Sequence, residues 1–190
     1  GIPVLLRTLF AAVFQFGVAG FGISLVALYR KEPFTAHGLR VKGSLLSIAL
    51  CVLCFVPYII FQLFSHALTS YLPFQTVWTT KEVLAAGFPA NLVGMLIIAV
   101  FWGFFEGFNY VVISDIINRR FPSDNIWLNW GAICCAVFCV LIHGAVGVTP
   151  AAFLEMLAVI FIIYGMLVTK EITGNAWGCV FIFVFLWNAL

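Results

Sequence analysis

Residues 90–113 read ANLVGMLIIAVFWGFFEGFNYVVI, an apolar run with a single charged side chain, Glu106. A helix that crosses the hydrocarbon core of a bilayer needs about 20 largely apolar residues, so this run predicts a transmembrane helix. Backbone polar groups in lipid must bond within the protein, and a membrane barrel would alternate apolar and polar residues along each strand. The continuous run therefore favours an all-α fold.

The composition extends this interpretation to the whole chain. Of its 190 residues, 64% are hydrophobic and 8% are charged, and the mean hydropathy is +1.17. Soluble domains carry charge on about a quarter of their residues, so a soluble enzyme and a disordered chain are both excluded. A net charge of +2 is too small to indicate an anionic partner, and no nucleic acid is expected. The expected partner is the lipid bilayer.

Charged or proline-marked breaks divide the chain into six apolar runs, at residues 8–29, 44–65, 90–113, 127–148, 151–169 and 173–190. We therefore predict a polytopic integral membrane helical bundle of about six transmembrane helices. The first run is too long for the core of a signal peptide and is interpreted as a retained span. We expect one membrane domain, in which residues 1–89 form N-terminal helices and loops and residues 90–190 form the core.

The placement of lysine and arginine predicts the orientation of these spans. If the loop of residues 30–42 is cytoplasmic, Arg7 and Lys81 are the two basic residues that fall outside. Basic residues gather on the cytoplasmic side of membrane proteins, so the N-terminus is expected outside. The seven basic residues then expected inside are Arg30, Lys31, Arg40, Lys42, Arg119, Arg120 and Lys170.

Four polar side chains are expected at membrane depth, where ionisable groups are costly and mark a functional site by default. In an antiparallel helical hairpin, residues equidistant from the turn lie at the same depth. Counting from each predicted turn places Glu106, His143, Glu155 and Asn188 on one layer.

Two interpretations of this layer stay open. In the first, His143 and Glu155 satisfy each other as a buried pair, while Glu106 bonds to Asn109 or Tyr110. In the second, the layer is a hydrated pocket in which Glu106 acts as a general base on water. His143 and the Asn188 amide would then stabilise an oxyanion.

Metal and thiol chemistry give a weaker signal. All six cysteines lie in apolar runs, where a free thiol behaves as a small hydrophobe. Cys139 and His143 are one helical turn apart, a spacing that two ligands of one metal can have. No cofactor is predicted, and a divalent metal at His143 with Glu106 or Cys139 is the alternative.

The stretches FFEGFNYVVISDIINRRF, AICCAVFCVLIHG and TGNAWGCVFIFVFLWNAL together resemble the CPBP family of CAAX proteases and bacteriocin-processing enzymes, also called the Abi family. FFEGFNYVVISDIINRRF (104–121) resembles the family's Glu-Glu-x-x-x-Arg helix, and AICCAVFCVLIHG (132–144) its Phe-x-x-x-His helix. TGNAWGCVFIFVFLWNAL (173–190) resembles the closing motif, which ends in His-x-x-x-Asn, and HGLR (37–40) resembles the family's lead-in. The resemblance implies a four-helix core within residues 90–190, in a bacterial or archaeal plasma membrane.

The resemblance also implies a function and a site. It assigns intramembrane cleavage of a peptide or membrane-anchored protein, with Glu106 activating water and His143 and Asn188 completing the site. Several motif positions depart from the family pattern. Phe105 or Gly107 replaces a second glutamate, Tyr110 or Val111 the arginine, Cys139 the phenylalanine, and Val184 the histidine.

These departures favour a second hypothesis, a catalytically degenerate membrane scaffold or immunity protein that binds a partner without proteolysis. A small transporter is a third interpretation, because polar residues at depth also line permeation paths. The sequence shows no evident inverted repeat of the kind that many transporters have.

Overall fold

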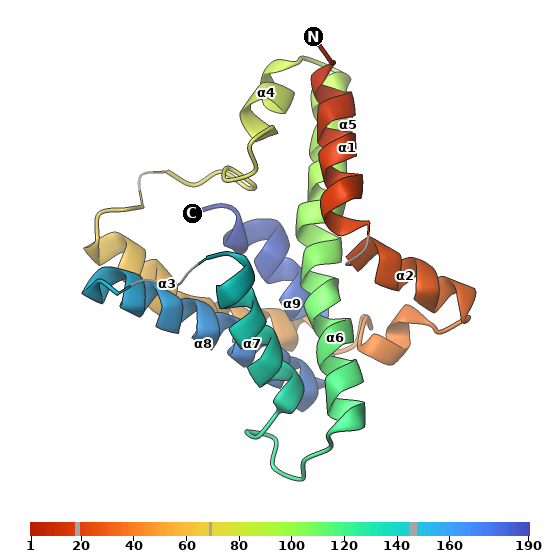
Figure 1. Cartoon of the computed structure of the whole chain (residues 1–190), viewed down its shortest axis with the longest axis vertical. Helices are drawn as coiled ribbons and strands as arrows, with labels where there is room; N and C mark the ends of the chain where they lie inside the picture. Colours follow the sequence, from red (N-terminus) through yellow and green to blue (C-terminus); the bar gives the residue numbers. More distant parts are fainter. Residues whose placement is uncertain (18–19, 69, 145–147) are drawn as a thin grey trace. The chain divides into compact units, whose positions relative to one another are not determined.

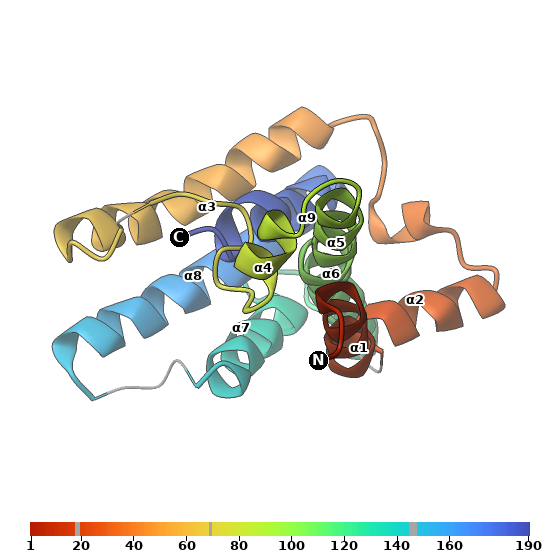
Figure 2. The ribbon, with the colours of Figure 1, turned by 90° about the horizontal axis from the view of Figure 1, so that it is seen from above.

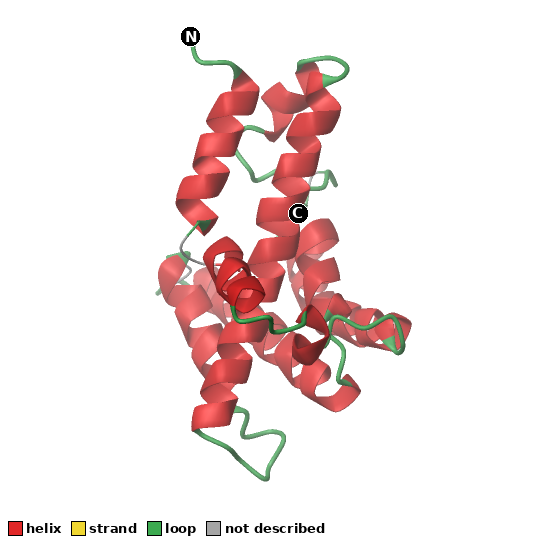
Figure 3. Ribbon diagram, turned by 90° about the vertical axis from the view of Figure 1, so that its right-hand side faces the viewer, coloured by secondary structure: helices red, strands yellow, loops and turns green. Residues whose placement is uncertain are grey.

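The computed structural model of the chain consists of helices joined by loops (Figure 1). It describes residues 1–17, 20–68, 70–144 and 148–190. No strand occurs among these residues, as Figure 3 also shows, so the expected all-α class is confirmed. The expected runs 8–29 and 127–148 include residues 18–19 and 145–147, which lie outside the described residues.

Three helices are long and apolar enough to cross a membrane: α3 (Ser44–Phe64), the continuous helix Ala90–Arg120, and α8 (Pro150–Thr173). They coincide with three of the six expected runs. The continuous helix is made of α5 (Ala90–Ile98), the π-helical segment η2 (Ala99–Phe105) and α6 (Glu106–Arg120). It extends beyond the expected end at residue 113, because arginines in a last turn complement the helix dipole.

The other three expected runs contain helices shorter than the roughly 20 residues that a membrane crossing needs. Their bounds are α1 (Val4–Phe16), α2 (Gly20–Tyr29), α7 (Trp130–Ile142) and α9 (Trp177–Ile182), which the π-helical segment η3 (Phe183–Trp187) continues. The count of six spans therefore stays a prediction. Two short elements lie in expected loops, namely η1 (Phe34–His37) and α4 (Thr80–Ala85).

The helices form two compact units. Unit 1 comprises Gly1–Phe34, Thr69–Asn109 and Val180–Leu190, and unit 2 comprises Thr35–Leu68 and Tyr110–Cys179. Packing thus defines units that are interleaved along the chain. The expected division at residue 89 separates two consecutive parts of the chain, residues 1–89 and 90–190, and it stays a prediction.

Unit 1 is built around α5 and η2. α1 runs beside α5 (Figure 1), α4 packs on α5, and η3 packs on η2. The rings of Phe16 and Trp102 meet edge to face, with centroids 5.4 Å apart. The buried core consists of Ala12, Phe16, Phe74, Val77, Val83, Ile98 and Trp102.

Unit 2 is a layer of helices with α8 in the middle. Figure 2 shows α3 along one side of α8 and α7 along the other, and both pairs are in extensive contact. The break that the sequence predicted before residue 151 is an N-cap, since the Thr149 side chain accepts a hydrogen bond from the Ala152 amide at 3.2 Å. At the other end Gly174, with a φ of 63°, terminates α8.

One asparagine ties the ends of α8 and α3 together. Asn175, fully buried, donates from Nδ2 to the carbonyl oxygens of Arg40 (2.6 Å) and Lys42 (3.0 Å). The Ser47 hydroxyl of α3 donates to the Asn175 carbonyl at 2.8 Å and accepts from the Gly178 amide at 3.1 Å. The start of α9 is therefore held directly against the first turn of α3.

This contact makes Gly178 a position where a larger residue cannot fit. A Cβ built there would lie 2.5 Å from the Ser47 carbonyl oxygen, a backbone atom that cannot rotate away. We expect Gly178→Ala to destabilise the protein by about 1–3 kcal/mol through overpacking. That loss lowers the melting temperature by about 2–4 °C per kcal/mol, measured by circular dichroism in detergent.

Gly165→Ala is the matched control, because a Cβ at residue 165 meets only the Cys54 side chain, at 2.8 Å from Sγ. That thiol can turn aside, so the control should lose less stability. If the melting temperature of the Gly178→Ala protein is equal to or higher than that of the Gly165→Ala protein, the close contact of α9 with α3 is contradicted.

Candidate functional site

The residues predicted to form a polar layer are distributed over both units. Glu106, Asn109 and Asn188 belong to unit 1, whereas Tyr110, His143 and Glu155 belong to unit 2. The structure therefore brings the first three into one compact unit, and the single layer that joins all of them stays a prediction.

Glu106 is buried in the longest apolar helix of the described chain. It is the first residue of α6, directly after the π-helical segment η2, and it is 8% exposed. π-helical turns within longer helices are rare and occur frequently at functional sites. A buried carboxylate in an apolar helix carries a large desolvation cost, which favours a functional reason for keeping it.

Asn188 follows the second π-helical segment, η3, which packs on η2. We call the contact of Ala99–Phe105 with Phe183–Trp187 the η2–η3 junction. At this junction the Asn188 Oδ1 accepts a hydrogen bond from the Thr76 hydroxyl at 3.1 Å, and its Nδ2 lies 3.5 Å from the Trp102 carbonyl oxygen. Glu106 and Asn188 are thus the residues that directly follow the two segments of one contact.

Gly103 allows the two segments of the junction to approach closely. A Cβ at residue 103 would lie 2.6 Å from Cγ2 of Val184 and 3.3 Å from its Cα. Gly103 and Gly107 form a small-xxx-small pattern around Glu106, and η3 packs against the first of these glycines.

The side-chain amide oxygen of Asn109 has no hydrogen-bond donor within reach among the described residues. This atom, Oδ1, is buried. A buried polar atom without a partner costs about 1–3 kcal/mol. Residues three apart on a helix are neighbours, so this acceptor lies one turn from Glu106 on the same helix. The Asn109 amide oxygen is therefore available to a donor, one turn from the Glu106 carboxylate.

His143 lies at the C-terminal end of α7, where its side chain is exposed. Its Nδ1 is 2.9 Å from the Cys139 carbonyl oxygen and 3.7 Å from the Cys139 Sγ. We assign the Nδ1 proton to the carbonyl bond, which makes Nε2 the unprotonated nitrogen of the neutral ring. A metal shared with Cys139 through Nδ1 would have to replace that bond.

The other two site candidates in unit 2 are Glu155 and Tyr110. Glu155 is exposed on the second turn of α8. Tyr110 is buried, and its backbone carbonyl accepts a hydrogen bond from the Cys135 thiol at 3.7 Å, which joins α6 to α7. Among the described residues, no group of three or more His, Cys, Asp or Glu side chains is placed to hold a metal ion.

Unit 2 contains an ionic cluster that was not predicted from the sequence. The Asp115 carboxylate of α6 accepts a hydrogen bond from His37 Nδ1 at 2.9 Å and is paired with the Lys170 ammonium of α8. Lys170 also pairs with Glu171 at 2.9 Å. His37 is 2% exposed and Lys170 is 9% exposed, whereas Asp115 is half-buried and Glu171 is exposed. We call these four residues the Asp115 cluster.

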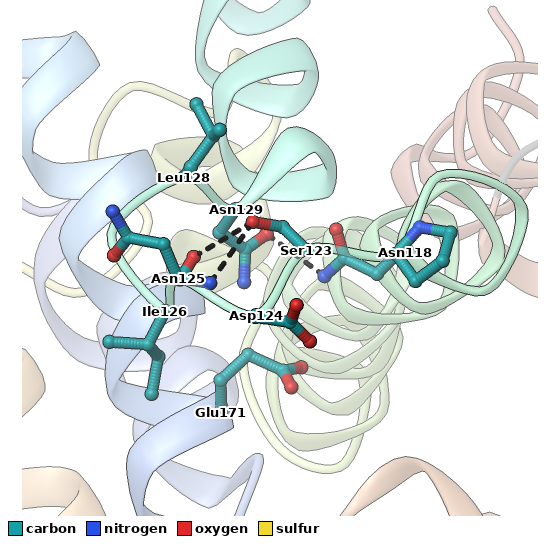
Figure 4. A pocket seen from close by; sticks show the side chains of 9 residues that line it. Asn118, Ser123, Asp124, Asn125, Ile126, Leu128, Asn129 and Glu171 are labelled. Atoms are coloured by element: carbon teal, nitrogen blue, oxygen red, sulfur yellow. Dashed lines mark hydrogen bonds between the residues drawn. The ribbon is translucent and has the colours of Figure 1, made fainter.

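A polar pocket of about 360 Å³ lies at the loop between α6 and α7 (Figure 4). Its wall is held by a pair of asparagines. Asn129 Oδ1 accepts from Asn118 Nδ2 at 2.9 Å and from the Ala132 amide at 2.8 Å, and so caps α7. The other residues that line the pocket are Pro122, Ser123, Asp124, Asn125, Ile126, Leu128 and Glu171.

Comparison of the chain with models of known protein families, with curated proteins and with solved structures gives no match.

The Asp115 cluster predicts a large effect from a single substitution. Asp115→Leu leaves buried Lys170 and His37 without their shared anion, and breaking a buried pair in this way costs about 3–5 kcal/mol. Lys170 keeps Glu171 as a partner, so we expect a loss of about 3 kcal/mol, or about 6–12 °C in melting temperature.

Two variants control this measurement. Asp115→Leu combined with Lys170→Met removes both charges and should recover part of the loss. Glu82→Gln breaks the Arg7–Glu82 pair, whose side chains are 35% and 52% exposed, and should cost less than about 1 kcal/mol. Equal melting temperatures for Asp115→Leu and Glu82→Gln would show that the cluster is not a buried ionic contact.

Proposed function

We propose that the chain is an integral membrane endopeptidase of the CPBP type, in which Glu106 activates the water that attacks a peptide bond. The observation that supports this proposal best is the buried Glu106 carboxylate, which lies at the junction of η2 and α6 in a membrane-length helix. The unsatisfied Asn109 acceptor one turn away adds a second polar group for water or substrate.

The chemistry follows from what a carboxylate can do. Glu106 takes a proton from water while the water oxygen attacks the carbonyl carbon of the substrate. Glu106 then returns the proton to the amine as the C–N bond of the tetrahedral intermediate breaks. A general base of this kind contributes about 10²–10⁴-fold in rate.

His143 and Asn188 are proposed to stabilise the oxyanion. The Asn188 Nδ2 bond to the Trp102 carbonyl is long, at 3.5 Å, so this amide can turn to a better acceptor at little cost. Because His143 Nδ1 bonds to the Cys139 carbonyl, its Nε2 can donate only when the ring is an imidazolium. The substrate class is a peptide or membrane-anchored protein within or beside the bilayer.

The proposal includes the membrane topology. Six spans with a four-helix CPBP-like core, an outside N-terminus and a cytoplasmic 30–42 loop are inferred for a bacterial or archaeal plasma membrane. Supporting this orientation, basic residues gather at one end of unit 2, where the C-terminal end of α8 is bonded to the segment before α3. These residues are Arg40, Lys42, Arg119, Arg120 and Lys170.

A catalytically degenerate scaffold that binds a partner is the second candidate. The observation that favours it is the packing of Val184, which stands where the family motif has histidine and lies against Gly103 in the η2–η3 junction. Tyr110, at the position of the motif arginine, is buried as well. These positions are filled by packing groups in place of ionisable ones.

The peptidase proposal predicts that Glu106→Gln abolishes cleavage. Membranes of cells that make the wild-type chain should contain new protein N-termini, identified by N-terminal labelling and mass spectrometry. These termini should fall at least about 100-fold in Glu106→Gln, because the amide cannot accept the water proton. Glu32→Gln, at an exposed glutamate after α2, is the matched control and should leave them unchanged. The same termini at wild-type levels in both Glu106→Gln and His143→Ala would reject proteolysis and favour the scaffold.

Because the proposed reaction uses no cofactor, we expect metal chelators to leave the cleavage rate unchanged. With Glu106 as the base, EDTA should not change the cleavage rate of the purified chain, and elemental analysis should find no stoichiometric metal. Stoichiometric zinc or another divalent metal that is lost in His143→Ala would instead support the metal site of His143 with Glu106 or Cys139.

A further inference from the structure

An apolar groove of about 580 Å³ runs between α6 and α7 within unit 2. Its walls are two pairs of side chains, each pair one helical turn apart: Ile117 and Phe121 on one side, Trp130 and Cys134 on the other. Phe121 continues the helix, since its amide bonds to the Ile117 carbonyl at 2.8 Å. The volume lies within the range of about 300–1,000 Å³ that is usual for small-molecule sites.

The rim of this groove is cationic. Arg120 ends α6 and is exposed, and its guanidinium lies over the Phe121 ring, 5.4 Å from the ring centroid. Arg120 has no carboxylate partner among the described residues, whereas Arg7 and Lys170 both do. Its charge is therefore available to an anion beside an apolar slot.

The groove also begins at the depth where lipid headgroups are expected. It starts where a membrane-length helix ends and its polar, exposed loop begins. Trp127 and Trp130 are exposed there, and tryptophan is enriched at the interface of membrane and water. From Trp130 the groove extends one turn along α7 to Cys134, toward the apolar part of the helix.

We propose that this groove binds an anionic phospholipid, with one acyl chain along Ile117 and Cys134 and the phosphate held by Arg120. Basic pockets between membrane helices on the cytoplasmic side bind anionic headgroups for this reason. An apolar segment of a partner protein would not need the arginine, and a zwitterionic lipid would gain less from it. The proposal does not rest on proteolytic activity.

The test uses tryptophan quenching by lipids with brominated acyl chains. The full chain is placed in phosphatidylcholine nanodiscs that contain increasing fractions of brominated phosphatidylglycerol, or of brominated phosphatidylcholine. We expect half-maximal quenching at a mole fraction several-fold lower for phosphatidylglycerol. Trp130→Phe should remove more than half of the difference between the two lipids, because Trp130 lines the groove.

The arginine variants test the headgroup contact. Arg120→Gln should weaken the preference for phosphatidylglycerol about fivefold. Arg30→Gln changes another exposed arginine beside an exposed aromatic residue, Tyr29, and should leave the preference intact. Glycerol phosphate, which has no acyl chain, should not displace the lipid.

Three results would overturn the proposal. They are equal quenching by the two brominated lipids in the wild type, equal losses in Arg120→Gln and Arg30→Gln, and displacement by glycerol phosphate. If the Arg120→Gln protein fails to fold by circular dichroism, the wild-type comparison and Trp130→Phe still decide.

Discussion

The ion pair between Asp115 and Lys170 is the interaction on which the packing of unit 2 depends. It joins α6 to α8, and α8 in turn packs against both α3 and α7. Because the same carboxylate accepts a bond from His37, it also fixes the segment that leads into α3. Charges in an apolar interior are tolerated only when they are paired, so each of these three groups constrains the positions of the other two.

Unit 1 depends on a different constraint, the contact of two π-helical segments. Irregular backbone at membrane depth is tolerated only where protein covers it. In unit 1 each segment covers the other. Val184 packs on Gly103, and the Asn188 side-chain nitrogen lies 3.5 Å from the Trp102 carbonyl oxygen. A regular α-helix then resumes at Glu106, so the irregular backbone and the buried carboxylate occur at the same place in the chain.

Hydropathy was sufficient to predict the all-α class and the three long helices, because a membrane crossing is a local property of about 20 residues. The expected run 44–65 matches α3 (Ser44–Phe64) to within one residue. The same rule misjudged the end of α6, since charges were interpreted as the break that a helix dipole in fact accommodates.

The candidate site was predictable only where a residue stood out from its neighbours. Glu106 is a lone carboxylate in an apolar run, so the sequence alone singled it out. Asp115 has two arginines nearby and resembles a loop charge, and its burial depends on Lys170, 55 residues later. The two π-helical segments likewise leave no periodic signal, because they are stabilised by their contact with each other.

The hydrogen bonds from Asn175 to the carbonyl oxygens of Arg40 and Lys42 have a consequence for how unit 2 would sit in a bilayer. α3 has 21 residues and α8 has 24, so their lengths are about 32 and 36 Å, slightly more than a hydrocarbon core of about 30 Å. Their ends are tied through the backbone of Arg40 and Lys42, so neither helix can slide along the other. A bilayer of different thickness must therefore be met by tilting the pair as one body, and the basic side chains at that end tilt with it.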